Sequence, residues 1–255
     1  MQDFLHQLSH LISWKITLVG IALFLIRVVI LTALENLNPA HVVEYRKVLP
    51  RDFLVALVFF FLVLPAADFL DRRIVYQPSL PEWISEWPLA LRILLYLVLA
   101  DFGHYWVHRW LHTPMLWPSH RWHHSPTYMY WLAGTRGSVI QQALVNIPYI
   151  VSAAFVEVAP WWLAWAILLK NVAQNDFMHI NLWWGHRWLE WIIVTPRYHH
   201  IHHSVDPAHF RGNLAALFPV WDHLFGTFID PDKVSRNLVF GTGESIAPIR
   251  LAIGI

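Results

Sequence analysis

Two histidine clusters constrain how this chain can fold. Residues 120–124 and residues 199–203 each have the pattern HxxHH, with histidines at positions i, i+3 and i+4. These positions lie on one face of a helix, so the three imidazoles of a cluster could converge on one point. Neutral imidazole is the commonest metal ligand among side chains. The repeated pattern therefore predicts a metal centre built by two distant helical segments, which together could hold two ions.

The composition indicates a membrane protein. Of the 255 residues, 56% are hydrophobic and 14% are charged, a balance too apolar for an ordinary soluble domain. The formal net charge is only +1 and the sequence has no basic stripe, which argues against a nucleic-acid partner. The chain has no cysteine, which excludes thiolate zinc sites and iron–sulfur clusters. The metal ligands must therefore be histidine or carboxylate.

Long apolar runs predict an all-α fold, a multi-pass membrane bundle of four to five helices. Residues 16–34 and 53–69 form the first two runs, and a third starts at residue 88 and stays apolar to residue 100. The third run continues without a break into residues 101–112, which carry three histidines. We therefore expect a membrane helix that emerges directly into a histidine-rich helical cap.

A fourth apolar region, residues 139–173, is interrupted by Pro148 and Pro160. Proline disrupts a helix interior, so we expect two helices joined by a tight turn. They would either span the bilayer as a hairpin or only dip into it. The amphipathic residues 187–194 are expected to lie at the membrane interface.

Basic residues predict the orientation in the membrane. They follow the first run and flank both histidine clusters, on one face if the helices alternate: Arg46, Lys47, Arg51, Arg109, Arg121, Arg136, Arg187, Arg197 and Arg211. Cytoplasmic loops are enriched in such residues. We therefore expect an integral membrane protein with a cytoplasmic metal site and an N-terminus on the opposite side, the side on which Arg72 and Arg73 would lie.

Further histidines extend the candidate site. His104, His108 and His112 recur at i, i+4 and i+8 on one helix face, and His179 follows the fourth apolar region. So many imidazoles exceed the roughly four to six positions of one transition metal, which favours two ions. The sequence lacks both HExxH, the zinc-protease motif, and ExxH, the motif of soluble carboxylate-bridged di-iron bundles. Zinc held only by nitrogen is an alternative to iron.

Together the motifs resemble the fatty acid hydroxylase or sterol desaturase superfamily of membrane-bound non-haem di-iron enzymes, with the pattern HxxxH, HxxHH, (F/Y)xH and HxxHH. The corresponding segments here are residues 108–112, 120–124, 177–179 and 199–203. Three flanking segments also match: Tyr105-Trp106, Thr195-Pro196-Arg197 and residues 221–227. The resemblance covers residues 89–228.

This resemblance implies that nine histidines ligate two iron ions: His108, His112, His120, His123, His124, His179, His199, His202 and His203. His104 would be a tenth ligand or a hydrogen-bond partner of a ligand. Asp101 and Asp176 could accept the second N–H of His104 and His179, or could cap helix ends. Asp222 is expected to hold the C-terminal segment against the histidine helices rather than to bind metal.

The same resemblance implies that the di-iron centre is the catalytic group. It would use O2 and two external electrons to hydroxylate or desaturate a C–H bond of a lipid, such as a fatty acyl chain or a sterol. The sequence has no GxGxxG motif, P-loop or cysteine, so a separate cytochrome b5-like, ferredoxin-like or reductase-like donor must supply the electrons. The implied parts are N-terminal membrane helices (1–88), a fatty acid hydroxylase-like domain (89–230) and a C-terminal tail (231–255).

Two other classes of protein are compatible with the motifs. A zinc-bound membrane hydrolase or isomerase would use the same ligands without O2. A non-catalytic metal-binding or lipid-binding membrane protein would tolerate loss of a ligand such as His202. The sequence identifies no substrate-binding residue.

Overall fold

The computed structural model describes residues 14–74, 82–153, 155, 175–243 and 248–255. Helices and irregular segments make up this part of the chain, and no β-strand occurs in it; one isolated bridge pairs Ser204 with Phe240. The predicted all-α class is therefore confirmed for the described residues. The chain divides into two compact units, residues 1–39 and residues 40–255.

The first unit contains one described helix, α2 (Trp14–Leu37), which includes the whole first apolar run. The helix ends directly before Asn38 and Pro39. A proline disfavours helical backbone in the residue before it, which explains this end point.

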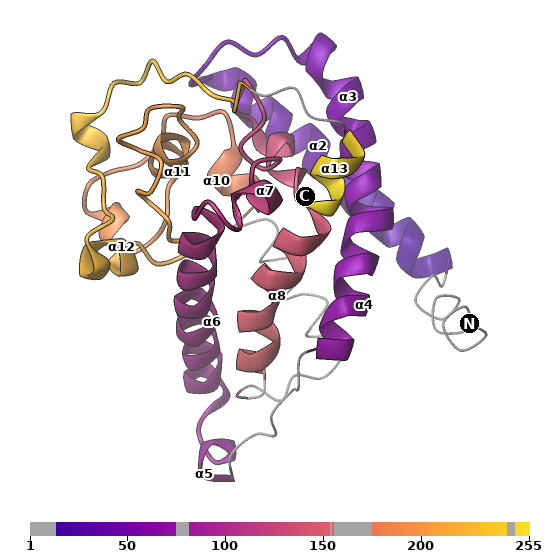
Figure 1. Cartoon of the computed structure of the whole chain (residues 1–255), viewed down its shortest axis with the longest axis vertical. Coiled ribbons are helices and arrows are strands. Elements are labelled where there is room, and N and C mark those ends of the chain that lie inside the picture. The colour runs from indigo at the N-terminus through magenta and orange to yellow at the C-terminus, as the bar shows by residue number, and fades with distance from the viewer. Residues whose placement is uncertain (1–13, 75–81, 154, 156–174, 244–247) are drawn as a thin grey trace. The chain divides into compact units, whose positions relative to one another are not determined.

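The second unit begins with a long helical rod. In it α3 (Tyr45–Val58), the π-helical turn η1 (Phe59–Val63) and α4 (Leu64–Ile74) follow one another without a break (Figure 1). Pro65 lies just after the π-helical turn. Because proline lacks an N–H and clashes with the carbonyl four residues earlier, the wider turn relieves a conflict that a regular helix would have there.

Two stretches of the described residues are long and apolar enough to cross a membrane: Tyr45–Arg73 and α6 (Leu89–Leu111). The short helix α5 (Glu82–Ser85) precedes α6. As predicted, α6 runs from the apolar residues straight into the histidine-bearing ones. These two stretches support membrane association.

The apolar helix α8 (Val139–Ala153) packs against both α6 and α4 (Figure 1). The predicted break at Pro148 is wrong, because α8 continues through this residue. Pro148 lies against Gly103 of α6, where a Cβ atom would come within 2.7 Å of the proline ring. The missing side chain at Gly103 thus lets the two helices approach closely. The predicted turn at Pro160 and the helix after it lie outside the described residues.

Short helices joined by irregular segments form the histidine cap, which comprises the described residues 112–138 and 175–243. Its helices are α7 (Trp117–His120), η2 (Trp131–Thr135), α10 (Phe177–His179), η4 (Leu189–Trp191), α11 (Pro196–His202), α12 (Val220–Phe225) and η5 (Pro231–Lys233). The last described helix of the chain, α13 (Pro248–Ile253), contacts α7 and α8. In Figure 1, α7, α10 and α11 lie beyond the C-terminal end of α6.

A buried apolar cluster joins the end of α6 to the cap. Its members come from α6, α10, α11 and the segments before α11 and α12: Tyr105, Met178, Val194, Tyr198, Leu214 and Ala215. Burying this apolar area favours the docked arrangement, at roughly 25 cal/mol per Å² removed from water. The cluster therefore holds together the elements that carry the histidines.

Candidate metal centre

The nine histidines of the four motifs form two groups in the structure. Group 1 consists of His108, His112, His120, His124 and His202. Group 2 consists of His123, His179, His199 and His203. Within each group the candidate ligand nitrogens all lie within 4.8 Å of one another, and every one of the nine side chains is buried. His104 lies outside both groups.

Each HxxHH cluster divides its histidines between the two groups. His120 and His124 belong to group 1, whereas His123 belongs to group 2. In the second cluster the assignment is reversed, with His202 alone in group 1. The expectation that the three imidazoles of a cluster converge on one point is therefore wrong. Adjacent positions i+3 and i+4 differ by about 100° around a helix, so their side chains diverge toward two neighbouring points.

The two groups touch. The rings of His124 and His203 stack with their centroids 4.3 Å apart, and the rings of His120 and His123 stack at 5.2 Å. Nine imidazoles from α6, α7, α10, α11 and the residues directly after α6, α7 and α11 thus form one continuous buried cluster with two centres.

Backbone carbonyls orient four of the nine rings. Nδ1 of His108 donates to the Leu214 carbonyl at 2.7 Å, and Nδ1 of His202 donates to the Gly212 carbonyl at 2.9 Å. In group 2, Nδ1 of His123 donates to the Arg136 carbonyl at 3.1 Å. Nδ1 of His179 donates to the Asn175 carbonyl at 2.6 Å. A carbonyl can only accept, so Nδ1 carries the proton and the lone pair of each ring is on Nε2.

The Nε2 atoms converge more closely than neutral imidazoles alone would favour. In group 2 the three Nε2 atoms of His179, His199 and His203 are 3.0–3.2 Å apart. In group 1, Nε2 of His120 lies 3.1 Å from Nε2 of both His108 and His124. Nε2 of His202 is buried and has no hydrogen-bond partner. Nitrogens that share one ion at roughly 2.0–2.1 Å lie about 3 Å apart, so the residues present fit a metal in each group.

Burial keeps the cap histidines neutral. It lowers the pKa of His179 to about 4, and it also lowers the pKa of the other group 2 residues and of His112, His120, His124 and His202. Neighbouring imidazoles add to this effect, because each disfavours a positive charge on the next. At neutral pH these rings are therefore in the form that binds metal.

Two carboxylates do not have the predicted contacts. Asp101 was expected to pair with His104 or to cap a helix end, but it accepts from the Phe218 N–H at 2.8 Å and the Trp221 Nε1–H at 3.0 Å. It lies inside α6, and these two donors from the C-terminal segment surround its side chain. Asp176 does not accept from Nδ1 of His179, because the Asn175 carbonyl, four residues before His179, takes that position. Asp176 precedes α10 but makes no side-chain cap hydrogen bond.

His104 belongs to neither histidine group and contacts α8: its Nδ1 atom lies 3.2 Å from the hydroxyl oxygen of Tyr149.

Asp222 lies outside both histidine groups and holds the C-terminal segment. Its carboxylate accepts from the backbone N–H groups of Leu214 and Ala215 at 2.8 and 2.7 Å. The carbonyl of the same Leu214 orients His108, so Asp222 supports a group 1 ring indirectly.

Sequence reasoning missed a buried network around Asp52. This aspartate lies in α3, outside the motifs, and its side chain is fully buried. It contacts Arg136, whose carbonyl orients His123. The available signal was a lone acidic residue at the edge of an apolar run, because a carboxylate in such a position needs a partner.

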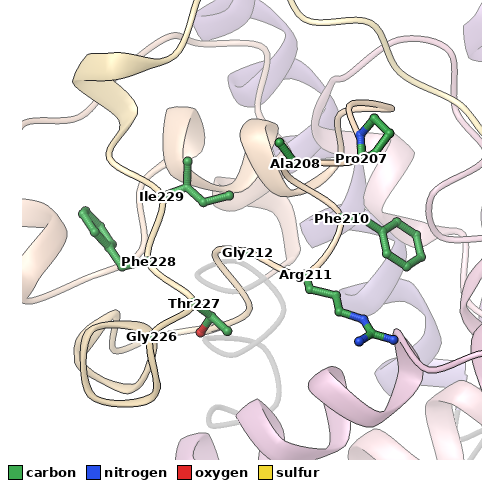
Figure 2. Close-up of a pocket in the computed structure, with 9 residues that line it drawn as sticks. All are labelled: Pro207, Ala208, Phe210, Arg211, Gly212, Gly226, Thr227, Phe228 and Ile229. Atoms are coloured by element: carbon green, nitrogen blue, oxygen red, sulfur yellow. The ribbon is translucent and has the colours of Figure 1, made fainter.

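A pocket of about 450 Å³ opens beside group 1. Figure 2 shows the residues that line it: Pro207, Ala208, Phe210, Arg211, Gly212, Gly226, Thr227, Phe228 and Ile229. Gly212 separates it from His202, which donates to the Gly212 carbonyl. The Phe210 ring meets His112 edge-on at 5.0 Å. The wall of this pocket is thus in direct contact with two members of group 1.

The family model described as fatty acid hydroxylase matches residues 93–227, just over half of the chain and all nine grouped histidines. The chain is 32% identical to ornithine lipid hydroxylase OlsE of Rhizobium tropici, over 67% of this chain and 53% of the relative. It is 32% identical to alkylglycerol monooxygenase of Danio rerio, over 63% of this chain and 35% of the relative.

A third relative is methylsterol monooxygenase 1-3 of Arabidopsis thaliana, 26% identical over 59% of this chain and 50% of the relative. The matched part of the chain spans about half or less of the length of these curated relatives. No solved structure matches the chain.

Proposed function

This chain belongs to the fatty acid hydroxylase family, and from that premise we propose that it is a membrane-bound oxygenase with two iron ions that hydroxylates or desaturates a C–H bond of a lipid. The observation that carries the proposal is the pair of buried imidazole groups with converging Nε2 atoms. When bound, two iron ions supply the activation of O2 and the oxidation of the C–H bond.

The donor set is compatible with iron and excludes metals that prefer oxygen ligands. Imidazole suits iron, zinc, copper and nickel, whereas magnesium and calcium prefer oxygen ligands. Among the described residues, neither group contains a carboxylate. Group 1 would hold one ion with up to five imidazoles, and group 2 would hold the other with up to four. Zinc suits the same ligands and is the alternative that metal analysis must test.

The protein's own part is to orient the ligands and to exclude water. The four backbone carbonyls fix which nitrogen of each ring faces the ion. Residues 129–133 are fully buried and lead into or form part of η2, which packs against α10, the helix that carries His179. Exclusion of water from such a site protects reactive chemistry from side reactions.

The substrate class follows from the position of the site and from the relatives. Group 1 begins at the C-terminal end of α6, a helix long and apolar enough to cross a bilayer, so a lipid would reach the site from the membrane boundary. The relatives are named for an ornithine lipid, an alkylglycerol and a methylsterol, which share a hydrophobic body rather than a headgroup. We propose a fatty acyl, sterol or related lipid as substrate.

The remaining features of the proposal concern topology and partners. The N-terminal helices (1–88) anchor a multi-pass protein, residues 89–230 form the catalytic domain, and residues 231–255 form a tail. The basic residues beside the histidine clusters favour a cytoplasmic histidine cap. Two electrons come from a separate donor protein, since the sequence has no motif for a nucleotide or iron–sulfur cofactor of its own.

Comparative lipid profiling tests the function. Cells that express the chain should contain a lipid that has gained one oxygen atom or lost two hydrogen atoms, and cells that express the His202→Ala variant should lack it. Metal analysis of active, detergent-purified protein should find about two iron ions per chain. Stoichiometric zinc without iron in active material would overturn the proposal in favour of a zinc hydrolase or isomerase. An unchanged cellular role in the His202→Ala variant would favour a non-catalytic protein.

A further inference from the structure

Asp52 is a buried carboxylate on a membrane helix that also reaches the histidine cap. It lies in α3, within the stretch Tyr45–Arg73 that is apolar enough to cross a membrane, and its side chain is fully buried. An ionisable side chain is costly in such a helix unless it is paired. The matched family region begins only at residue 93, so Asp52 lies outside it.

Three side chains of one segment, residues 128–136, converge on this carboxylate. The Arg136 Nη2 group contacts Oδ1 of Asp52 at 2.6 Å. The hydroxyls of Tyr128 and Tyr130 donate to Oδ2 at 2.7 and 2.9 Å. Burial and the Asp52 carboxylate both raise the pKa of Tyr130, which keeps its hydroxyl protonated as a donor. One carboxylate therefore holds both ends of the 128–136 segment.

The same segment contacts two of the four group 2 histidines. The Arg136 carbonyl accepts from Nδ1 of His123 at 3.1 Å. Gly134 packs so closely on His179 that a Cβ atom there would lie 2.6 Å from Nδ1. Arg136 also donates from Nη1 to Ser125, the second residue after His123, at 3.0 Å. A shift of the segment would therefore move the partners of both His123 and His179.

We propose that Asp52 is a positioning residue for group 2, acting through the 128–136 segment on His123 and His179. The inference rests on the proposed two-metal function. It extends the metal centre to a helix that carries none of the histidine motifs. It also predicts selectivity, because the 128–136 segment contacts the group 2 ligands His123 and His179 directly, whereas its path to group 1 is indirect, through Ser125, the residue after His124.

The test measures Co2+ binding to metal-free, detergent-solubilised full-length chain, with the cobalt absorption bands as the signal. In a His108→Ala/His112→Ala/His202→Ala background group 1 keeps two imidazoles, so the remaining high-affinity site is group 2. In a His179→Ala/His199→Ala background group 2 keeps two imidazoles, so the remaining high-affinity site is group 1. Asp52→Asn should weaken Co2+ binding about 10-fold in the first background. Loss of a residue that supports a metal ligand typically lowers metal affinity by about 10-fold to 100-fold, and Asp52 acts only indirectly. It should leave the affinity unchanged in the second background.

Asp71→Asn is the matched control. Asp71 is a buried carboxylate on the same helical rod, in α4, and accepts from Asn146 at 2.9 Å without any contact to a histidine. This variant should leave Co2+ binding unchanged in both backgrounds. Asp52→Glu, which keeps the charge, should restore part of the affinity lost in Asp52→Asn and shift its cobalt bands back toward those of the parent.

Each outcome decides the inference. Equal affinity of Asp52→Asn and its parent for Co2+ at group 2 overturns it, and so does an equal loss at both groups. If Asp52→Asn does not fold, Arg136→Lys tests the same path, since it keeps the charge but loses the planar guanidinium, and the same selective loss is expected. Failure of the unmutated chain to bind Co2+ at either group would instead overturn the proposed function.

Discussion

The rings of His124 and His203 stack at 4.3 Å, and each belongs to a different group of the metal centre. The two groups are therefore in direct contact through these two rings, and a substitution of either ring changes the packing around both groups. Loss of a ligand at this boundary should therefore affect metal binding in both groups, whereas loss of a ligand away from the boundary should affect only its own group.

His203→Ala should reduce the iron content from about two ions per chain to about one and should weaken the ion that stays. The substitution removes a group 2 ligand and leaves a cavity against His124 of group 1. Metal analysis after dialysis against a weak chelator measures both effects. His186→Ala, at an exposed position outside both groups, should keep the full iron content. Two ions retained in His203→Ala would contradict the assignment of this ligand.

Gly134→Ala should lose the group 2 ion. The new Cβ atom would lie 2.6 Å from Nδ1 of His179 and 2.8 Å from Oδ1 of Asn175, so the imidazole must turn or move. Overpacking of this kind costs about 1–3 kcal/mol of stability. Gly137→Ala is the control, because its Cβ would meet the Phe59 ring at 3.1 Å instead of a histidine. It should lower the melting temperature while both ions stay bound.

Glu190→Gln should destabilise the histidine cap. Glu190 is fully buried, and its carboxylate accepts two hydrogen bonds from Arg197, at 2.6 and 2.7 Å. Arg197 lies two residues before His199. Removal of one partner of a buried pair costs about 3–5 kcal/mol, and Asp232 keeps the loss near the lower end because it also contacts Arg197. Asp68→Asn removes an exposed ion pair with Arg72 and should change the unfolding free energy by less than about 1 kcal/mol. Similar unfolding free energies for the two variants would contradict this assignment.

Stability should fall with acidification partly because of His41. Burial, together with the nearby positive charge of Arg236, lowers the pKa of His41 from 6.5 to about 4. The unfolded state therefore binds more protons between these pH values, and stability decreases as the pH falls from about 6.5 to 4. Chemical unfolding at several pH values should show a shallower dependence for His41→Phe. An identical dependence in both proteins would exclude His41 as a contributor.

The sequence was sufficient for much of this fold because its strongest signals are local. Apolar length predicted α2 and α6, and the run from apolar residues into His104, His108 and His112 is one helix as expected. Pro148 was misread because its cost depends on a tertiary contact, the close approach to Gly103. The orientation in a membrane stays a prediction.

At the candidate site, the motifs identified the histidines that cluster, but not how they divide. The spacing itself separates i+3 from i+4 by about 100° around a helix. Which group each side chain then joins depends on how α7 and α11 face each other, and the spacing does not specify this. Supporting contacts were harder to predict. Asp101 and Asp176 were paired with histidines by proximity in sequence, whereas backbone carbonyls distant from the motifs, such as that of Leu214, have that role.

Main-chain carbonyls, not side chains, accept from the four oriented histidines. A side-chain substitution at Asn175 or Leu214 leaves the carbonyl in place, so such a change need not alter ring orientation. Gly212 is the exception, because a Cβ atom there would collide with the Ile229 side chain. An insertion or deletion between His202 and Leu214 would displace two acceptors at once. The loops around the centre should thus tolerate changes of residue type far better than changes of length.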